Sequence, residues 1–258
     1  MEKKINKVKQ FFTGLEFNEE QHTYNVKSRY LTSVSKTISK YVEHVDFDMI
    51  AGFVAKKRTK ETGIYTTKAM ILAEWEAKKN NSCTQGTNVH LFGETYVKAK
   101  KRTKHKQGRD GRETGETEVE GMRATNGFES AIVRFWDSIP DHIQPFLFEI
   151  QMFSEELGIA GTADIILYNT KTNKFILADY KTNEDLFKNF KGKKLLAPFD
   201  NLLENSFNKY QLQLSMYQLL FEQCGYEIES RRVIWLKPDG SFENLKTEDY
   251  THILKNEL

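Results

Sequence analysis

Cysteine is scarce in this chain, which has two, Cys83 and Cys224, among 258 residues. Two thiols are too few for a disulfide scaffold, for a four-thiolate zinc site or for an iron–sulfur cluster. The low count is typical of a reducing compartment, so we expect a cytoplasmic protein. Both cysteines are interpreted as small, buried apolar side chains.

Long apolar runs are also absent. No stretch approaches the roughly 18 consecutive apolar residues of a membrane-spanning helix. The basic start, residues 1–12, contains no apolar segment and does not resemble a secretory signal. We therefore expect no membrane partner.

Net charge is small, because 38 Lys and Arg residues nearly balance 36 Asp and Glu residues and leave +2 at pH 7. This balance excludes a histone-like polycation. It does not exclude nucleic-acid binding, since local patches of opposite sign cancel in a sum. What the chain does have is 39% hydrophobic and 12% aromatic residues, which predicts an ordered globular protein of one or two domains.

Residue spacing predicts helices first and strands later. After a hairpin at 15–26, apolar spacing predicts helices over 33–41, 48–60, 66–79, 86–98 and 123–138. Residues 99–121 are rich in Lys, Arg and Gly without an apolar period, so they predict a mobile, exposed loop. Strands are predicted over 146–153, 159–168, 174–181 and 231–237, with a helix over 208–223.

This order predicts one α/β domain over residues 1–258. Its parts are an N-terminal hairpin with helices (1–85), a core (86–237) and a C-terminal tail (238–258).

The third predicted strand ends with Asp179, Tyr180 and Lys181. Residues two apart on a strand share a face, so Asp179 and Lys181 point one way and Tyr180 the other. Asp164 lies on the preceding strand. Two carboxylates at neighbouring strand ends suit Mg²⁺, which can lower the pKa of a bound water and offset charge on a phosphorane-like transition state. The alternative is a solvated strand end where Asp179 and Lys181 merely pair.

The Asp/Glu-x-Lys pattern has little meaning by itself, since it recurs at Glu2–Lys4 and Glu76–Lys78. The copy at Asp179–Lys181 differs in context, because it ends an apolar strand and follows a strand with its own Asp.

Four ordered segments add to this pattern: GTNVH (86–90), GIAGTADIILYN (158–169), KFILADYKTN (174–183) and QLSMY (213–217). Together they resemble the PD-(D/E)XK nuclease superfamily, and within it the RecB-like exonuclease branch of phage exonucleases and the mitochondrial genome maintenance exonuclease. The resemblance covers roughly residues 15–237. It implies a restriction-endonuclease-like core, a mixed sheet with an antiparallel meander flanked by helices, with helical N-terminal elaboration.

The resemblance also implies a site. Its metal ligands would be His90, Asp164, Asp179 and the backbone carbonyl of Tyr180. Its catalytic residues would be the two Asp residues, Lys181, and the pair Gln213 and Tyr217 on one helical face. Possible additional ligands are Glu149 and Glu94. Alternatives stay open: a capping or core role for His90, a core tyrosine at Tyr217 and a solvent-facing Glu94.

The implied activity is Mg²⁺-dependent hydrolysis of DNA, with Mn²⁺ able to substitute, on single strands or free ends in replication, recombination or repair. Proteins of replication or recombination would be partners. Two departures are visible: Ala163-Asp164 replaces the Pro-Asp of the family name, and the cysteines of cluster-bearing relatives are missing. Two alternatives remain, an endonuclease of restriction or CRISPR-adaptation type and an inactive nucleic-acid-binding module.

Residues 187–194 interleave aromatic and basic side chains: Phe187, Lys188, Phe190, Lys191, Lys193 and Lys194. Basic groups can neutralise phosphates and rings can stack on bases, so this segment is a predicted DNA contact. The alternative is a solvated loop with one buried Phe. The basic cluster at 99–112 is either a second contact or a solubilising loop.

Overall fold

The computed structural model describes residues 1–21, 23–107 and 122–258, with the backbone alone for 101–107. The chain forms two compact units. We call Met1–Val42 with Phe92–Leu258 the sheet unit, and Glu43–Leu91 the helical unit.

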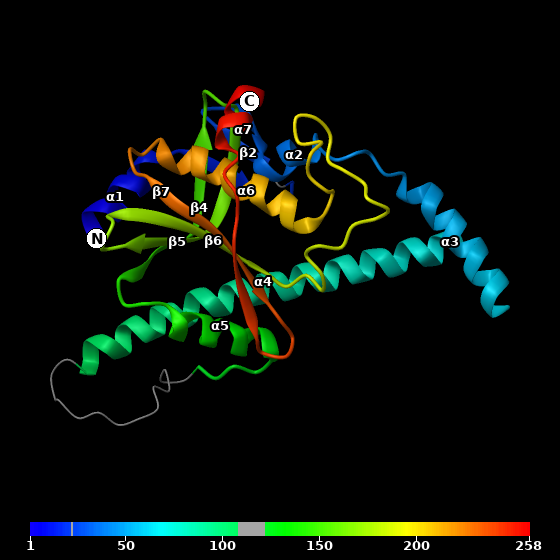
Figure 1. Ribbon diagram of the computed structural model, residues 1–258, viewed down its shortest axis with the longest axis horizontal. Helices are drawn as coiled ribbons and strands as arrows, with labels where there is room; N and C mark the ends of the chain where they lie inside the picture. The colour runs from blue at the N-terminus through cyan, green and yellow to red at the C-terminus, as the bar shows by residue number, and fades with distance from the viewer. Residues whose placement is uncertain (22, 108–121) are drawn as a thin grey trace. The chain divides into compact units, whose positions relative to one another are not determined.

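The sheet unit contains a mixed eight-stranded sheet, which confirms the predicted α/β class (Figure 1). The pairs β3–β5 and β6–β7 are parallel, and the other pairs are antiparallel. The strands are β1 (Leu15–Asn18), β2 (Thr23–Val26), β3 (Arg29–Ser33), β4 (Ile143–Ser154), β5 (Ile159–Asn169), β6 (Lys174–Lys181), β7 (Ile228–Leu236) and β8 (Phe242–Lys246). The PD-(D/E)XK fold itself stays a prediction.

Strand β5 has three partners for its two edges. β4 follows β5 along its whole length, from Asn169 back to Ile159. The other edge is divided, because β3 pairs with Ile159 and Ala160 while β6 pairs only from Ile165 onward. Residues 161–164 therefore lie where the sheet divides between β3 and β6. We call this place the fork.

One face of the sheet is covered by α6 (Ser206–Glu222), close to the predicted helix at 208–223. The ring of Phe175 on β6 packs against Phe221 on α6 at a centroid distance of 5.2 Å, and Leu177 faces the same core. Burying such a side chain stabilises a fold by about 1.5–3 kcal/mol. Around α6 lie α1 (Glu2–Phe11), α2 (Val34–Ser39) and α7 (Thr251–Glu257).

The opposite face of β6 meets α5 (Gly127–Ser138). Trp136 Nε1 donates to the hydroxyl of Tyr180 at 2.6 Å, and the Phe135 ring lies edge-on to that of Tyr180. The helix begins four residues later than predicted, because Asn126 caps it by accepting from Glu129 N at 3.0 Å.

The helical unit contains α3 (Phe47–Thr62) and the first part of α4 (Lys68–Gln107). Asp46 caps α3 by accepting from Met49 N, and Gly63 ends it at φ +71°, a conformation that glycine adopts without strain. Ala51, Ala55 and Ile71 form the core of this unit.

Helix α4 corrects three predictions. The separate helices at 66–79 and 86–98 and the start of the loop at 99–121 are one continuous helix as far as Gln107. Residues 80–85 contain no Pro, and an interior glycine such as Gly86 costs a helix only about 1 kcal/mol, so nothing interrupts it. Cys83, expected to be buried, is exposed on this helix. The remainder of the predicted loop, 108–121, lies outside the described residues.

Four other elements were not predicted: α1, β3, β8 and α7. The last two correct the expected tail at 238–258, since β8 pairs with β7 and Leu254 of α7 is fully buried. These segments are short and are held by tertiary pairing, which local spacing does not reveal. None of the described helices is both long and apolar enough to cross a bilayer.

Gly127 generates a stability prediction. A Cβ there would lie 1.7 Å from the carbonyl oxygen of Pro238, whereas one at Gly86 would meet no heavy atom within 4 Å. Overpacking costs about 1–3 kcal/mol, so Gly127→Ala lowers the melting temperature by several degrees. Gly86→Ala, the control, is neutral or stabilising by up to about 1 kcal/mol. Calorimetry of both variants checks this, and equal melting temperatures would contradict the packing of α5 on the turn before β8.

Candidate functional site

Three carboxylates lie in one row across neighbouring strands at the fork. Glu149 on β4 lies opposite Asp164 on β5. Asp164 in turn lies opposite Asp179 on β6, one residue beyond the last ladder pair between β5 and β6. The flanking ladder pairs that fix this register are Phe148–Ile165, Ile150–Ala163 and Ile165–Ala178. Asp164 and Asp179, fifteen residues apart in the sequence, thus lie side by side, as the hairpin pattern predicts.

Glu149 has a left-handed backbone, with φ +47° in the middle of β4. A residue other than glycine adopts this conformation at a cost of about 1–3 kcal/mol, and such strain concentrates at functional positions. A carboxylate oxygen of Glu149 lies within 4.8 Å of one of Asp164. The exposed Glu149 side chain therefore shares the site with the half-buried Asp164.

Asp164 and Asp179 form a carboxyl pair. Burial raises the pKa of Asp164 well above its ordinary value, and the negative charge of Asp179 together with a hydrogen bond between the two groups raises it further. Two carboxylates this close do not both ionise readily unless a positive charge lies between them. Asp179 is 2% exposed, so water screens its charge very little.

Lys181 provides one positive charge. Its Nζ lies 2.6 Å from Asp179 Oδ2, and its side chain is 17% exposed. Burial alone would lower the pKa of this ammonium, but the charges of Asp179 and Asp164 outweigh that effect, so the pKa is raised above its ordinary value. Lys181 is therefore a protonated cation at neutral pH and not a general base.

Tyr210 completes the surroundings of this lysine. Its ring centroid lies 4.4 Å from Lys181 Nζ, a cation–π distance, and its hydroxyl donates to Asn183 Oδ1 at 3.0 Å. Tyr210 belongs to none of the motifs that predict the site. Its position three residues before Gln213 on the same helix was the available signal, because residues three apart share a helical face.

Gln213 and Tyr217 both lie near the carboxyl pair. Gln213 Nε2 donates to the Tyr217 hydroxyl at 3.2 Å, while Gln213 Oε1 is buried without a hydrogen-bond partner among the described residues. Burial raises the pKa of Tyr217, and the charges of Asp164 and Asp179 raise it further. The ring also packs in the core against Gly161, where a Cβ would approach within 2.8 Å. Tyr217 is thus a core residue whose hydroxyl belongs to the polar site.

The sequence also predicts three further ligands. Glu94 pairs with Lys98 at 2.6 Å, one turn along α4, and its side chain is 24% exposed, so its role as a ligand stays a prediction. The Tyr180 side chain points to α5, as strand alternation predicts, and its backbone carbonyl stays a predicted ligand. His90 is half-buried on α4 within the helical unit, and its role as a ligand also stays a prediction.

The predicted DNA contact at 187–194 is partly anchored. The ring of Phe187 packs on Phe207 at 5.1 Å, whereas Phe190 is 72% exposed beneath the ammonium of Lys191. Lys193 pairs with Glu204 at 3.1 Å. The side chains left for a ligand are Phe190, Lys188, Lys191 and Lys194, which are all exposed.

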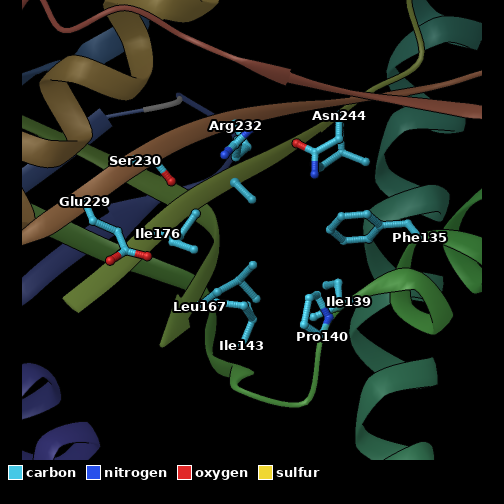
Figure 2. Close-up of a pocket in the computed structure, with 12 residues that line it drawn as sticks. Phe135, Ile139, Pro140, Ile143, Leu167, Ile176, Glu229, Ser230, Arg232 and Asn244 are labelled. Carbon is cyan, nitrogen blue, oxygen red and sulfur yellow. The ribbon is translucent and has the colours of Figure 1, made fainter. Parts of the chain in front are cut away.

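A separate apolar pocket of about 270 Å³ lies on the α5 side of the sheet (Figure 2). Ile176 and Ala178 of β6 line it together with Phe135 of α5 and Arg232 of β7. Because side chains alternate along β6, Asp179 and Lys181 point away from this pocket. The carboxyl pair is therefore not a part of it.

Comparisons with models of protein families and with curated proteins find no match to this chain. The family assignment accordingly stays a prediction based on the four segments, and a function must be argued from the site itself.

The carboxyl pair generates a pH prediction for the metal-free protein. A carboxyl group whose pKa is higher in the folded protein than in the unfolded chain stabilises the fold at low pH. This stability is lost as the pH rises from the pKa of the unfolded chain, near 3.9, through the pKa of the folded protein. In EDTA, Asp164→Asn removes this loss and is more stable than wild type near neutral pH, by a few degrees in melting temperature. The difference shrinks toward pH 4.

Thermal unfolding between pH 4 and 8 measures this difference. Asp200→Asn, at an exposed position, is the control and leaves the wild-type profile unchanged. If Asp164→Asn melts at a lower temperature than wild type at neutral pH, the repulsion between the Asp164 and Asp179 carboxylates is contradicted.

Proposed function

We propose that this protein is a metal-dependent DNA exonuclease that hydrolyses phosphodiester bonds of single-stranded DNA or DNA ends. The observation that supports it best is the group formed at the fork by the buried Asp179 with the partly buried Asp164 and Lys181. An acid pair with an adjacent ammonium suits metal-dependent phosphodiester hydrolysis, since negative charge accumulates on the phosphate during attack.

The residues fit a divalent cation. Carboxylate oxygens are the preferred ligands of Mg²⁺ and Mn²⁺, and Asp164, Asp179 and Glu149 offer them in one row. In the hydrogen bond between Asp164 and Asp179, a shared proton reduces the repulsion between the two carboxylates. A cation bound between them would reduce that repulsion in place of the proton. Gln213 Oε1 offers a buried acceptor to water around such an ion. His90 and the Tyr180 carbonyl are further proposed ligands.

When bound, Mg²⁺ or Mn²⁺ would supply Lewis-acid stabilisation of the phosphate. The protein's residues have distinct tasks. Asp164 and Asp179 would hold the cation, and Lys181, kept protonated by them, would donate a hydrogen bond to the phosphate or to the attacking water. The Tyr210 ring and Asp179 restrict the position of the ammonium. Tyr217 and Gln213 would orient polar groups from α6.

Phosphates of the substrate would contact the exposed lysines of 188–194, which directly follow β6. Phe190 offers an exposed ring for base stacking. Partners in replication or recombination and a cytoplasmic location stay predictions.

Loss of the site should abolish cleavage. Asp179→Ala and Lys181→Ala lower the Mg²⁺-dependent release of nucleotides from end-labelled DNA by about 100-fold or more, because each removes a charge needed in the transition state. Lys174→Ala is the matched control: Lys174 lies at the other end of β6 in an exposed ion pair with Glu227, and its loss leaves activity unchanged.

Two further arms of this assay separate the alternatives. EDTA stops the wild-type reaction if a cation is required. Cleavage of closed circular DNA would show an endonuclease, and absence of any cleavage with intact DNA binding would show a binding module. Full activity of both alanine variants would overturn the site.

Salt dependence tests the lysines. Replacing Lys188, Lys191 and Lys194 by Gln weakens single-stranded DNA binding, and the slope of log K against log salt falls by roughly 2, about 0.7 for each phosphate contact. Lys193 is retained because of its ion pair with Glu204. Replacing exposed Lys3, Lys9 and Lys40 is the control, with the wild-type slope. An equal slope in both triple variants would refute this contact.

A further inference from the structure

Helix α3 of the helical unit has two different faces. Ala51 and Ala55 are buried against Ile71 of α4. The opposite face is exposed and contains Met49 and Phe53, then Lys56 and Lys60, at spacings of three and four residues. Its first half is apolar and its second half is cationic. We call this exposed face, made by Met49, Phe53, Lys56 and Lys60, the α3 surface.

The apolar half of the α3 surface is accessible. The Phe53 ring is 65% exposed and the Met49 side chain, four residues earlier on the same face, is 55% exposed. Phe47 belongs to the other side of the helix, where its ring meets that of Trp75 edge-on at 6.3 Å. A single exposed apolar side chain needs no explanation, but two neighbouring ones beside cations form a candidate binding surface.

Cations on this face are available to a ligand. Lys56 and Lys60 have no ion pair within the described part of the chain, and Lys57 has a long one of 3.7 Å to Glu61. On the other side of α3, Arg58 is held by Glu74 at 2.7 Å. The free ammonium groups and the exposed Phe53 ring therefore lie on the same face.

We propose that the α3 surface binds single-stranded nucleic acid, with the Phe53 ring stacking on a base and the ammonium groups neutralising phosphates. The inference rests on the proposed function in naming DNA as the strand. Charge complementarity selects this ligand, since a bare ring beside lysines matches a strand with open bases and charged phosphates. A lipid surface would instead require a wide apolar face, and here only Met49, Ile50 and Phe53 provide one.

Binding of 5′-fluorescein-labelled dT20 in EDTA, followed by anisotropy, tests the proposal without cleavage. Phe53→Leu raises the dissociation constant at least about fivefold, because a stacked ring contributes about 1–3 kcal/mol. Lys56→Gln with Lys60→Gln reduces the salt slope by roughly 1.4. The replaced side chains are exposed, and circular dichroism verifies the fold.

The matched control uses α1, where Phe11 is 45% exposed near Lys3 and Lys9. Phe11→Leu leaves the dissociation constant for dT20 unchanged, and the double variant Lys3→Gln with Lys9→Gln leaves the salt slope unchanged. The proposal is overturned if the α3 variants bind dT20 as wild type does. It is also overturned if they lose only binding to phosphatidylserine vesicles.

Cleavage by the wild type in Mg²⁺ is measured separately. If the wild type fails to cleave while the α3 variants still lose dT20 binding, the exonuclease proposal fails and this inference stands. If the wild type cleaves and the variants bind normally, the inference fails alone.

Discussion

Mutual repulsion between the Asp164 and Asp179 carboxyl groups is the constraint around which the sheet unit is arranged. The sheet brings the two groups together in a partly dry place, where charges interact strongly. Lys181 offsets part of the repulsion, and Tyr210 holds the lysine from the other side. Such an arrangement is costly to fold, which supports the proposed cation site over a purely structural ion pair.

The fork positions the carboxyl pair. Over residues 161–164, β5 changes partners from β3 to β6. The acids lie at that change, while α6 closes one face above them with Gln213 and Tyr217. A rigid sheet thus positions the carboxylates, and a helix positions the polar groups that surround them.

Sequence patterns predicted the central strands within a few residues, because apolar alternation and turn residues are local signals. They also predicted that Asp164 and Asp179 would meet, since the register of a short hairpin follows from its turn. They failed for α4, where a polar stretch without apolar period is nonetheless helical, and for β8 and α7, which exist through their partners. Tyr210 was missed because its role arises from Lys181, a residue on another element.

By itself, the sequence determined the α/β class, the strand that holds Asp179 and Lys181 and the face they share, because the periodicity of side chains along a strand is set by backbone geometry. Only the tertiary structure decided that Glu149 opposes Asp164 with a left-handed backbone, that Tyr210 lies against Lys181, and that β5 divides its edge between two partners. These depend on pairing between segments far apart in the chain, and the energies that select such pairs come from packing and burial rather than from local propensity.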